Sequence, residues 1–344
     1  MSLARAIETG DLAQLPSRRD EDWRWTDLRG LIRAIPRPSP AFTGRLSAGP
    51  FDHLGDQKVS IVNGEARTRI SMVSSLPRVV ALRFVSVEAT AHAASPELTI
   101  APGSHLILLE SYEGASGDYI SEIDLTLTVG AGGRLDRIVL AQDAADAVSI
   151  ARCDIRLEAG ATLNQTVIVS GAKRQRMETH VSHPGHGASV RLDGLYLLAD
   201  RRHADITTVV THEGIDGTTD QLIKGVVRDQ ARGVFQGRIT VQRGADRTDA
   251  RMGHHALVLS DRAEVDAKPE LEIYADDVAC AHGNTVGALD EDALFYAQQR
   301  GIAEPEARAM LTEAFVGEVV DRIEHEGARE VVRAWVAEKL RGQG

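Results

Sequence analysis

Aromatic residues and cysteines are scarce in this chain of 344 residues. Phe, Trp and Tyr make up 4% of it, and the only two cysteines are Cys153 and Cys280. Two cysteines cannot build a disulfide framework, so the fold must depend on an apolar core, for which 43% hydrophobic residues suffice. The low aromatic content and the 31 glycines suit a stack of thin, repetitive strands better than a bulky core.

Long hydrophobic runs and clusters of positive charge are also missing. No segment approaches the roughly 20 apolar residues of a membrane-spanning helix, and the N-terminal MSLARAIETGDL lacks the apolar centre of a signal peptide. The formal net charge is −11, whereas nucleic-acid-binding domains usually carry a basic stripe. We therefore expect a soluble protein of a reducing cytoplasm, with Cys280 as a free thiol and with no nucleic-acid or membrane partner.

A small-residue turn followed by an apolar strand recurs through the middle of the chain. The copies begin at glycines spaced by 27 to 30 residues, at Gly103, Gly132, Gly160 and Gly187, and more weakly at Gly217 and Gly244. A fixed period of this length is typical of a solenoid, in which each coil stacks on the previous one. We predict a mainly β fold, a β-helix (β-solenoid) with two or three strands per coil, and keep a β-sandwich as the alternative.

Helical patterns are confined to the two ends of the chain. Residues 1–36 are predicted to be helical, with one helix from Ser2 to Leu15 and a second in which Trp23, Leu28, Leu31 and Ile32 have helical spacing. We expect Trp23 and Trp25 to be buried against the fold rather than to form a ligand platform.

Three further helices are predicted near the C-terminus. Asp290 should open the first, which ends at Gly301; the second should run from Glu304 to about residue 327 and the last over 328–340. The chain then divides into an N-terminal helical segment and linker (1–50), a β-helix core (51–288) and a C-terminal helical domain (289–344).

The candidate chemistry lies in residues 270–301, ELEIYADDVACAHGNTVGALDEDALFYAQQRG. Cys280 and His282 should lie where a strand gives way to a helix, followed by turn residues between 283 and 287. If the backbone is extended there, both side chains leave the same face of the strand. Thiolate and imidazole are suitable ligands for iron, zinc and iron–sulfur clusters. A buried cysteine and a hydrogen-bonded histidine without a metal remain the alternative.

Two ligands cannot close a tetrahedral metal site, and no second Cys/His cluster with ligand spacing exists in the sequence. We expect Cys153 in the core, and Asp276 and Asp277 in a turn rather than acting as an acid–base pair. Five histidines could line one face of a solenoid, but no spacing aligns them into a metal site: His180, His183, His186, His203 and His212. A metal bound by Cys280 and His282 would therefore need ligands from another subunit or from sulfide.

The segment DDVACAHGNTVGALDEDALFYAQQRGI (276–302) resembles the C-terminal signature of the SufB/SufD family, the scaffold proteins of the Suf iron–sulfur cluster assembly system. The resemblance extends over 180–212, 233–241 and 257–273, and to the N-terminal EDWRWT. The short chain and the absence of further cysteines favour SufD over SufB. The segment His-His-Ala (254–256) departs from the family, which is usually rich in asparagine there.

The resemblance implies a right-handed parallel β-helix and a non-catalytic scaffold subunit. A nascent, transient cluster would form at the interface with SufB, with His282 as a ligand and Cys280 beside it, and the β-helix end would bind SufB. The ATPase SufC would dock on the C-terminal helices, in keeping with the lack of a nucleotide-binding loop in this chain. The isolated chain would carry no cofactor and could form a homodimer.

Two other functions compete with this one. A β-helix enzyme acting on carbohydrate would need clustered acids and aromatic platforms, whereas here the acids are scattered and the aromatics few. A structural homodimer that binds no metal is the second alternative.

Overall fold

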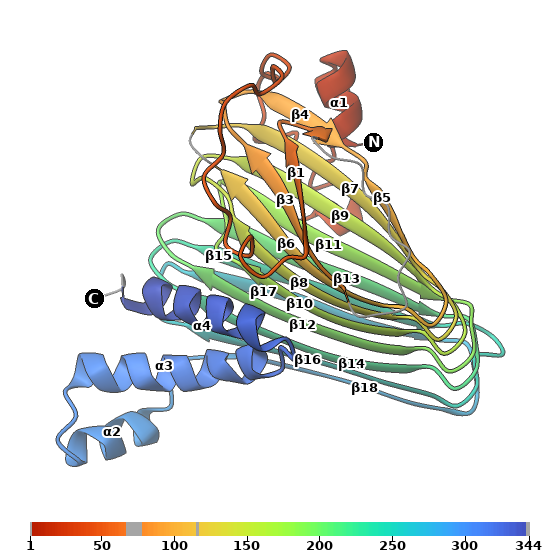
Figure 1. Ribbon diagram of the computed structural model, residues 1–344. Helices are drawn as coiled ribbons and strands as arrows, with labels where there is room; N and C mark the ends of the chain where they lie inside the picture. Colours follow the sequence, from red (N-terminus) through yellow and green to blue (C-terminus); the bar gives the residue numbers. More distant parts are fainter. Residues whose placement is uncertain (1, 67–77, 115–116, 342–344) are drawn as a thin grey trace.

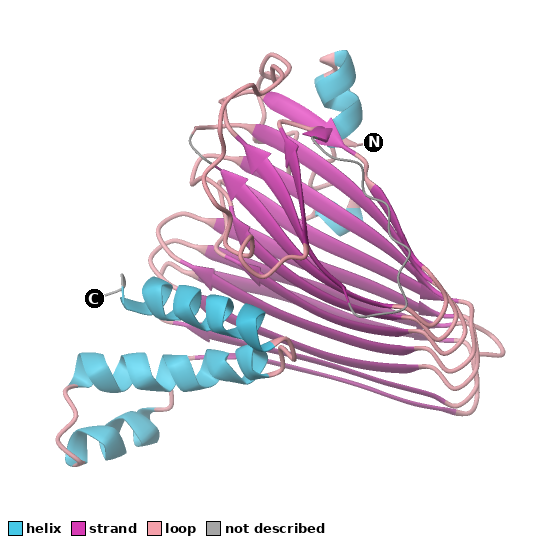
Figure 2. Ribbon diagram, viewed as in Figure 1, coloured by secondary structure: helices cyan, strands magenta, loops and turns pink. Residues whose placement is uncertain are grey.

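The computed structural model describes residues 2–66, 78–114 and 117–341. Its main body is a parallel β-solenoid of about seven turns, flanked by helices (Figures 1 and 2). This confirms the predicted fold class and rules out a sandwich, because the strands of each sheet run parallel and come from successive coils, apart from one short antiparallel pair at the N-terminal end of the larger sheet.

Each complete coil contributes one strand to each of two sheets, which we call sheet 1 and sheet 2. Among the described residues, sheet 1 has ten strands, in the order β2 (Glu65–Ala66), β1 (Gln57–Val62), β3 (Arg78–Ser86), β6 (His105–Gly114), β8 (Arg134–Gln142), β10 (Thr162–Val169), β12 (Ser189–Leu198), β14 (Thr218–Val227), β16 (Thr248–Val258) and β18 (Val278–Gly287). Sheet 2 runs from β4 (Ala91–Ala94) through β7 (Ile120–Val129), β9 (Val148–Leu157), β11 (Arg174–His183), β13 (His203–His212) and β15 (Arg232–Val241) to β17 (Glu264–Ile273), and β5 (Glu97–Ile100) also pairs with β7.

The predicted glycine period marks the corners that lead into sheet 1. Gly103, Gly132, Gly160 and Gly187 have φ between 64° and 68°, a left-handed conformation that favours glycine. Each donates its backbone N–H to a carbonyl of the next coil at 2.8–2.9 Å. The corners therefore repeat because each coil hydrogen-bonds the one that follows.

The last two of these corners do not use the predicted Gly217 and Gly244. Asp216 and Arg247 occupy them instead, each with φ of 58°. The Arg247 guanidinium bonds both carboxylate oxygens of Asp216, at 2.6 and 2.9 Å. Asp tolerates this conformation better than most residues, and the ion pair joins the two corners side by side.

Replacing Gly132 by alanine should lower the free energy of unfolding by about 1–2 kcal/mol, because an L-residue is strained at this positive φ. A Cβ there would meet nothing within 4 Å, so no steric clash contributes. Gly317→Ala, in a helix and also in open space, should instead raise the stability by about 0.5–1 kcal/mol. Urea unfolding followed by circular dichroism tests both; effects of the same sign would refute this account of the corner.

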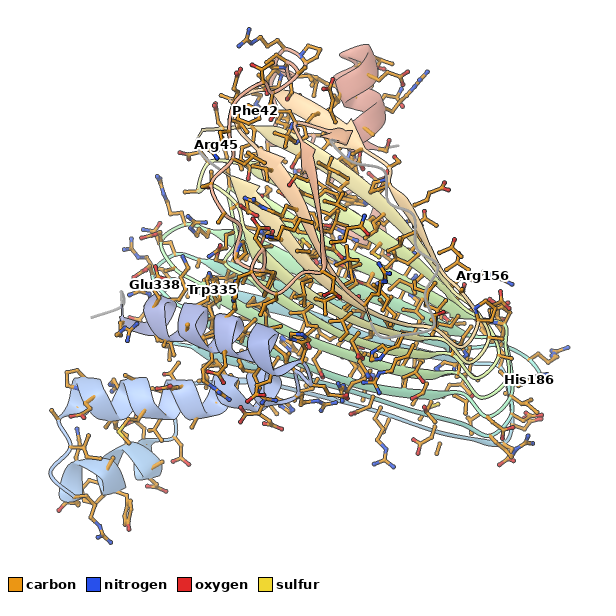
Figure 3. All side chains as sticks on the ribbon, in the orientation of Figure 1. Phe42, Arg45, Arg156, His186, Trp335 and Glu338 are labelled. Atoms are coloured by element: carbon orange, nitrogen blue, oxygen red, sulfur yellow. The ribbon has the colours of Figure 1, made fainter. Side chains whose placement is uncertain are left out.

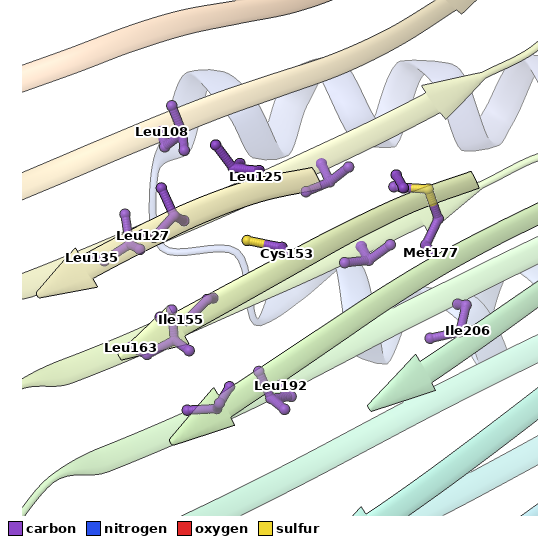
Figure 4. Packing of buried hydrophobic residues seen from close by; sticks show 14 of the residues in the cluster. Leu108, Leu125, Leu127, Leu135, Cys153, Ile155, Leu163, Met177, Leu192 and Ile206 are labelled. Atoms are coloured by element: carbon purple, nitrogen blue, oxygen red, sulfur yellow. The ribbon is translucent and has the colours of Figure 1, made fainter. Parts of the chain in front are cut away.

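The interior of the solenoid is packed with alternate side chains from both sheets. Figure 4 shows Cys153 of β9 among Leu125, Leu127, Ile155 and Met177. Its side chain is buried, and burial raises the pKa of the thiol to about 12. Cys153 is thus a core residue, as predicted.

The N-terminal segment is less helical than predicted. Of the described residues before β1, only α1 (Leu3–Thr9) and the short 3₁₀ turns η1 (Leu12–Gln14) and η2 (Glu21–Trp23) are helical. Gly10 ends α1 in the left-handed conformation. The apolar residues whose spacing indicated a second helix instead pack, without regular structure, on the outer face of sheet 2: Leu28, Leu31 and Ile32. Trp23 is half-buried there, 4.5 Å from the Arg176 guanidinium.

The C-terminal helices are α2 (Glu291–Gln299), α3 (Glu304–Asp321) and α4 (Glu326–Arg341). Asp290 caps α2 as predicted, accepting hydrogen bonds from two backbone N–H groups. The helix α3 ends six residues before the predicted 327. Its C-cap Arg322 reaches back to Asp193 of β12, at 3.1 Å, and the chain turns there into α4.

Helices α3 and α4 cover the outer face of sheet 1. Trp335 of α4 lies in this contact, whereas Glu338 is exposed (Figure 3). Lys224 of β14 adds a hydrogen bond to the Phe315 carbonyl at 3.0 Å. The helix α2 and the first half of α3 extend beyond the sheet (Figure 1). In the described part of the chain, no helix is long and apolar enough to cross a membrane.

Candidate functional site

The solenoid ends on two strands that have a neighbour on one side only. In the described topology β18 pairs with β16 and β17 pairs with β15, and each stands last in its sheet. The outer edges of both strands therefore offer unpaired backbone N–H and C=O groups. Exposed apolar side chains accompany this end: Ile273, Tyr274 and Val286 are 43%, 58% and 46% exposed.

Cys280 and His282 lie within β18, the last strand of sheet 1. The predicted turn between 283 and 287 is wrong, because these residues continue the strand in register with β16. The same register places Cys280 beside Ala250 and His282 beside Met252, two residues that are buried in the solenoid interior. Both side chains therefore lie on the inward-facing side of the terminal coil, and the common face agrees with their spacing.

The Cys280 thiol is half-buried against the end of the core. Desolvation raises its pKa and the nearby Asp249 raises it further, while a backbone hydrogen bond from Ala250 lowers it. Cys280 is therefore a protonated thiol at neutral pH, and a thiophilic metal would bind by displacing that proton.

His282 is exposed at the open end. Its imidazole makes no hydrogen bond or ion pair with any other described residue. His53 is likewise exposed without such a partner in the described part of the chain, so what distinguishes His282 is its position on the last strand, two residues from Cys280. One ring nitrogen is thus available to a ligand outside this subunit.

Cys280 and His282 alone do not make up a complete metal site. Within residues 2–66, 78–114 and 117–341, no group of three or more His, Cys, Asp or Glu could hold a metal ion. Asp276 and Asp277 lie in the bend that joins β17 to β18, as predicted, and the Asp277 carbonyl accepts the Arg247 N–H at 2.6 Å.

The five histidines of the middle coils do not form one cluster. His183 and His212 meet edge to face inside the solenoid, with ring centroids 3.9 Å apart and an interplanar angle of 82°. His180 bonds Glu178 and His203 bonds the Trp25 carbonyl, at 2.6 and 3.0 Å. His186 lies in the turn after β11 (Figure 3).

The structure adds a residue that the sequence analysis missed. Asn284 follows Cys280 and His282 at the same two-residue interval and lies on the same face of β18. Its side-chain oxygen bonds His254 Nδ1 at 2.7 Å. The two-residue spacing could have placed Asn284 on this face. The preceding Gly283, however, made the Gly-Asn pair indicate a turn.

Comparison with known proteins identifies the family. Residues 85–315 match the model "SUF system FeS cluster assembly, SufBD core domain". The chain is 27% identical to the iron–sulfur cluster assembly protein SufD of Escherichia coli, over 99% of this chain and 92% of that protein. It is 27% identical to a SufBD family protein of Mycobacterium leprae, over 96% and 92% of the two chains, and 31% identical to Bacillus subtilis SufD, over 40% and 31%.

The matched region contains both Cys280 and His282 and most of the solenoid. The chain therefore belongs to the SufB/SufD family of the SUF system for iron–sulfur cluster assembly and is most like SufD.

Proposed function

We propose that this protein is a non-catalytic scaffold subunit of a SufBCD complex and that Cys280 and His282 hold part of a nascent iron–sulfur cluster. The observation that carries this proposal is the placement of two soft ligands on one face of the last strand of an open-ended solenoid. The cluster is cargo, assembled and passed on, and an incomplete ligand set suits such a transient role.

A partner subunit would complete the site. The unpaired edges of β17 and β18 and the exposed Ile273, Tyr274 and Val286 suit the end of a second solenoid. We infer that this second solenoid is SufB, which supplies further ligands while free sulfide supplies the rest. A homodimer in the absence of SufB would use the same edges. The division of the chain at residues 50 and 288 remains a prediction.

We further propose that the ATPase SufC docks on the C-terminal helices. The helix α2 and the start of α3 extend from the body, with Phe295 62% exposed and Met310 50% exposed. A groove of about 720 Å³ next to them is lined in part by Leu259, Leu289 and Ala309. Because α3 and α4 also pack on sheet 1, which ends on β18, movement imposed by an ATPase could reach the cluster site.

The outer faces of the sheets do not favour a carbohydrate-active enzyme. Two carboxylates on the outer face of sheet 2 are engaged by arginines: Arg152 bonds Asp154 at 2.8 Å and Arg232 bonds Asp266 at 2.7 Å. Such pairing suits a salt-bridged surface and leaves those acids poorly placed for proton transfer.

Replacing His282 by alanine should reduce iron and sulfide retention by more than about tenfold, since one of few ligands is lost. The measurement is anaerobic reconstitution of the complex with SufB and SufC from the same organism, followed by iron and sulfide analysis. Because His282 is exposed and makes no internal contacts, gel filtration should show the complex intact.

His255→Ala is the matched control, because His255 lies on the adjacent strand, outside the inward-facing set, and bonds Thr285 at 2.7 Å. This control should retain a normal cluster. Normal assembly in the His282 variant would refute the proposed role of His282.

A further inference from the structure

Three polar side chains form a continuous hydrogen-bonded chain inside the last coils. Tyr196 Oη of β12 lies 2.9 Å from His254 Nε2 of β16, and His254 Nδ1 lies 2.7 Å from Asn284 Oδ1 of β18. Tyr196 and His254 are fully buried, whereas Asn284 is exposed at the open end. The chain therefore leads from the core to the face that carries Cys280 and His282.

Two glycines make room for this arrangement. A Cβ at Gly225 would lie 1.8 Å from Tyr196 Cζ, and one at Gly233 would lie 2.5 Å from Tyr196 Cε2. The Tyr196 ring thus passes over the intervening strand β14 at Gly225, where any side chain would clash with it. The His254 ring is stacked on Phe235, with centroids 4.8 Å apart and an interplanar angle of 13°. These contacts leave the imidazole little freedom to turn.

The hydrogen-bond partners determine the direction of each bond. The Tyr196 hydroxyl has no other partner among the described residues, so it donates to His254 Nε2. Burial lowers the pKa of His254 to about 4, which keeps the ring neutral at pH 7 with a single N–H. That proton is then on Nδ1 and is donated to Asn284 Oδ1.

The orientation of the Asn284 amide follows from this chain. An amide presents an oxygen acceptor and an NH₂ donor, and structures alone seldom distinguish them. Here the oxygen is engaged by His254, so the NH₂ group is the part left to interact at the open end. No other described residue accepts a hydrogen bond from it.

We propose that Asn284 is a third residue of the cluster site and donates N–H hydrogen bonds to sulfur held at Cys280 and His282. His254 and Tyr196 are positioning residues that keep the amide in its donating orientation. This inference rests on the proposed function. Sulfide and thiolate carry negative charge, and hydrogen bonds to them stabilise that charge and raise the reduction potential of a cluster.

The orientation of the Asn284 amide can be tested in the isolated protein, without any cluster. In protein labelled with ¹⁵N-histidine, NMR should show His254 as the Nδ1–H tautomer. Tyr196→Phe keeps the packing but removes the hydroxyl, so this tautomer should no longer be the single form. A wild-type His254 protonated on Nε2, or a Tyr196→Phe spectrum unchanged from wild type, would overturn the inferred orientation.

The donor role is tested in the complex reconstituted anaerobically with SufB and SufC. Asn284→Leu has nearly the same shape without the NH₂ group, and we expect about tenfold lower cluster retention and a more negative reduction potential. Asn284→Asp, which offers only acceptors, should lose more. Thr285→Val, on the opposite face of β18, is the control and should match wild type.

The outcomes separate this inference from the proposed function. An unchanged potential and retention in Asn284→Leu, or a gain in retention in Asn284→Asp, would refute the donor role while His282→Ala still lowers cluster retention. If His282→Ala also assembles clusters normally, the proposed function itself fails, and with it the role of Asn284. The tautomer of His254 would still show whether the hydrogen bonds between Tyr196, His254 and Asn284 exist.

Discussion

Arg137→Met should lower the free energy of unfolding by about 3–5 kcal/mol, because it leaves the charged Glu110 buried without its partner. The Arg137 side chain is 2% exposed and that of Glu110 is fully buried. Two parallel bonds join them, at 2.6 and 2.8 Å, and Arg137 also donates to Gln165 at 2.7 Å. Tyr112 donates a further bond to Glu110 at 2.9 Å. Urea unfolding followed by circular dichroism measures the loss.

Two further variants show whether the unpaired charge is the cause. Arg152→Met removes an arginine from an exposed pair with Asp154 on the same solenoid, and should cost at most about 1 kcal/mol. The double variant Arg137→Met/Glu110→Leu should recover much of the lost stability, since an apolar pair replaces the ion pair. If Arg137→Met costs no more than Arg152→Met, the buried pair does not contribute in the way described.

The fold was predictable because the solenoid repeats a local requirement. Each corner needs a left-handed residue, so Gly103, Gly132, Gly160 and Gly187 reveal the coil length without knowledge of long-range contacts. The glycine pattern is weaker at the last two corners, where Asp216 and Arg247 adopt the left-handed conformation and form an ion pair with each other. A pair separated by 31 residues carries no signal in one sequence.

The N-terminal segment and the end of α3 were harder to predict for a related reason. Leu28, Leu31 and Ile32 have helical spacing, but their burial comes from the outer face of sheet 2 rather than from a helix of their own. Similarly, α3 ends where Arg322 meets Asp193, a contact over 129 residues. Tertiary contacts overrode local propensity in both places.

At the candidate site, strand alternation was sufficient to predict that Cys280 and His282 share one face. It was insufficient to predict the orientation of the Asn284 side chain. The common face of these two side chains follows from period-two geometry once the segment is extended. The orientation of Asn284, however, depends on Tyr196 and His254, which are 58 residues apart in the sequence. Only the stacking of coils brings these side chains together.

Replacing His183 by leucine should make the protein more resistant to acid, by about 2–3 kcal/mol at pH 4.5 relative to wild type. His183 is fully buried, and neither ring nitrogen has a hydrogen-bond partner among the described residues. Burial lowers its pKa from 6.5 to about 4. The folded state therefore keeps the ring neutral while the unfolded chain binds a proton, so this contribution to stability is present above pH 6.5 and is lost as the pH falls toward 4.

The measurement is the free energy of unfolding in urea at intervals between pH 7 and pH 4.5. Leucine removes one titrating group, so the slope of stability against pH should become shallower by up to about 1.4 kcal/mol per pH unit below pH 6. Stability at pH 7 should not fall, because an unpartnered polar ring is replaced by an apolar side chain. His53→Leu, on the surface, controls for the loss of a histidine as such. Parallel pH curves for His183→Leu and wild type would show that His183 is not held neutral in the folded protein.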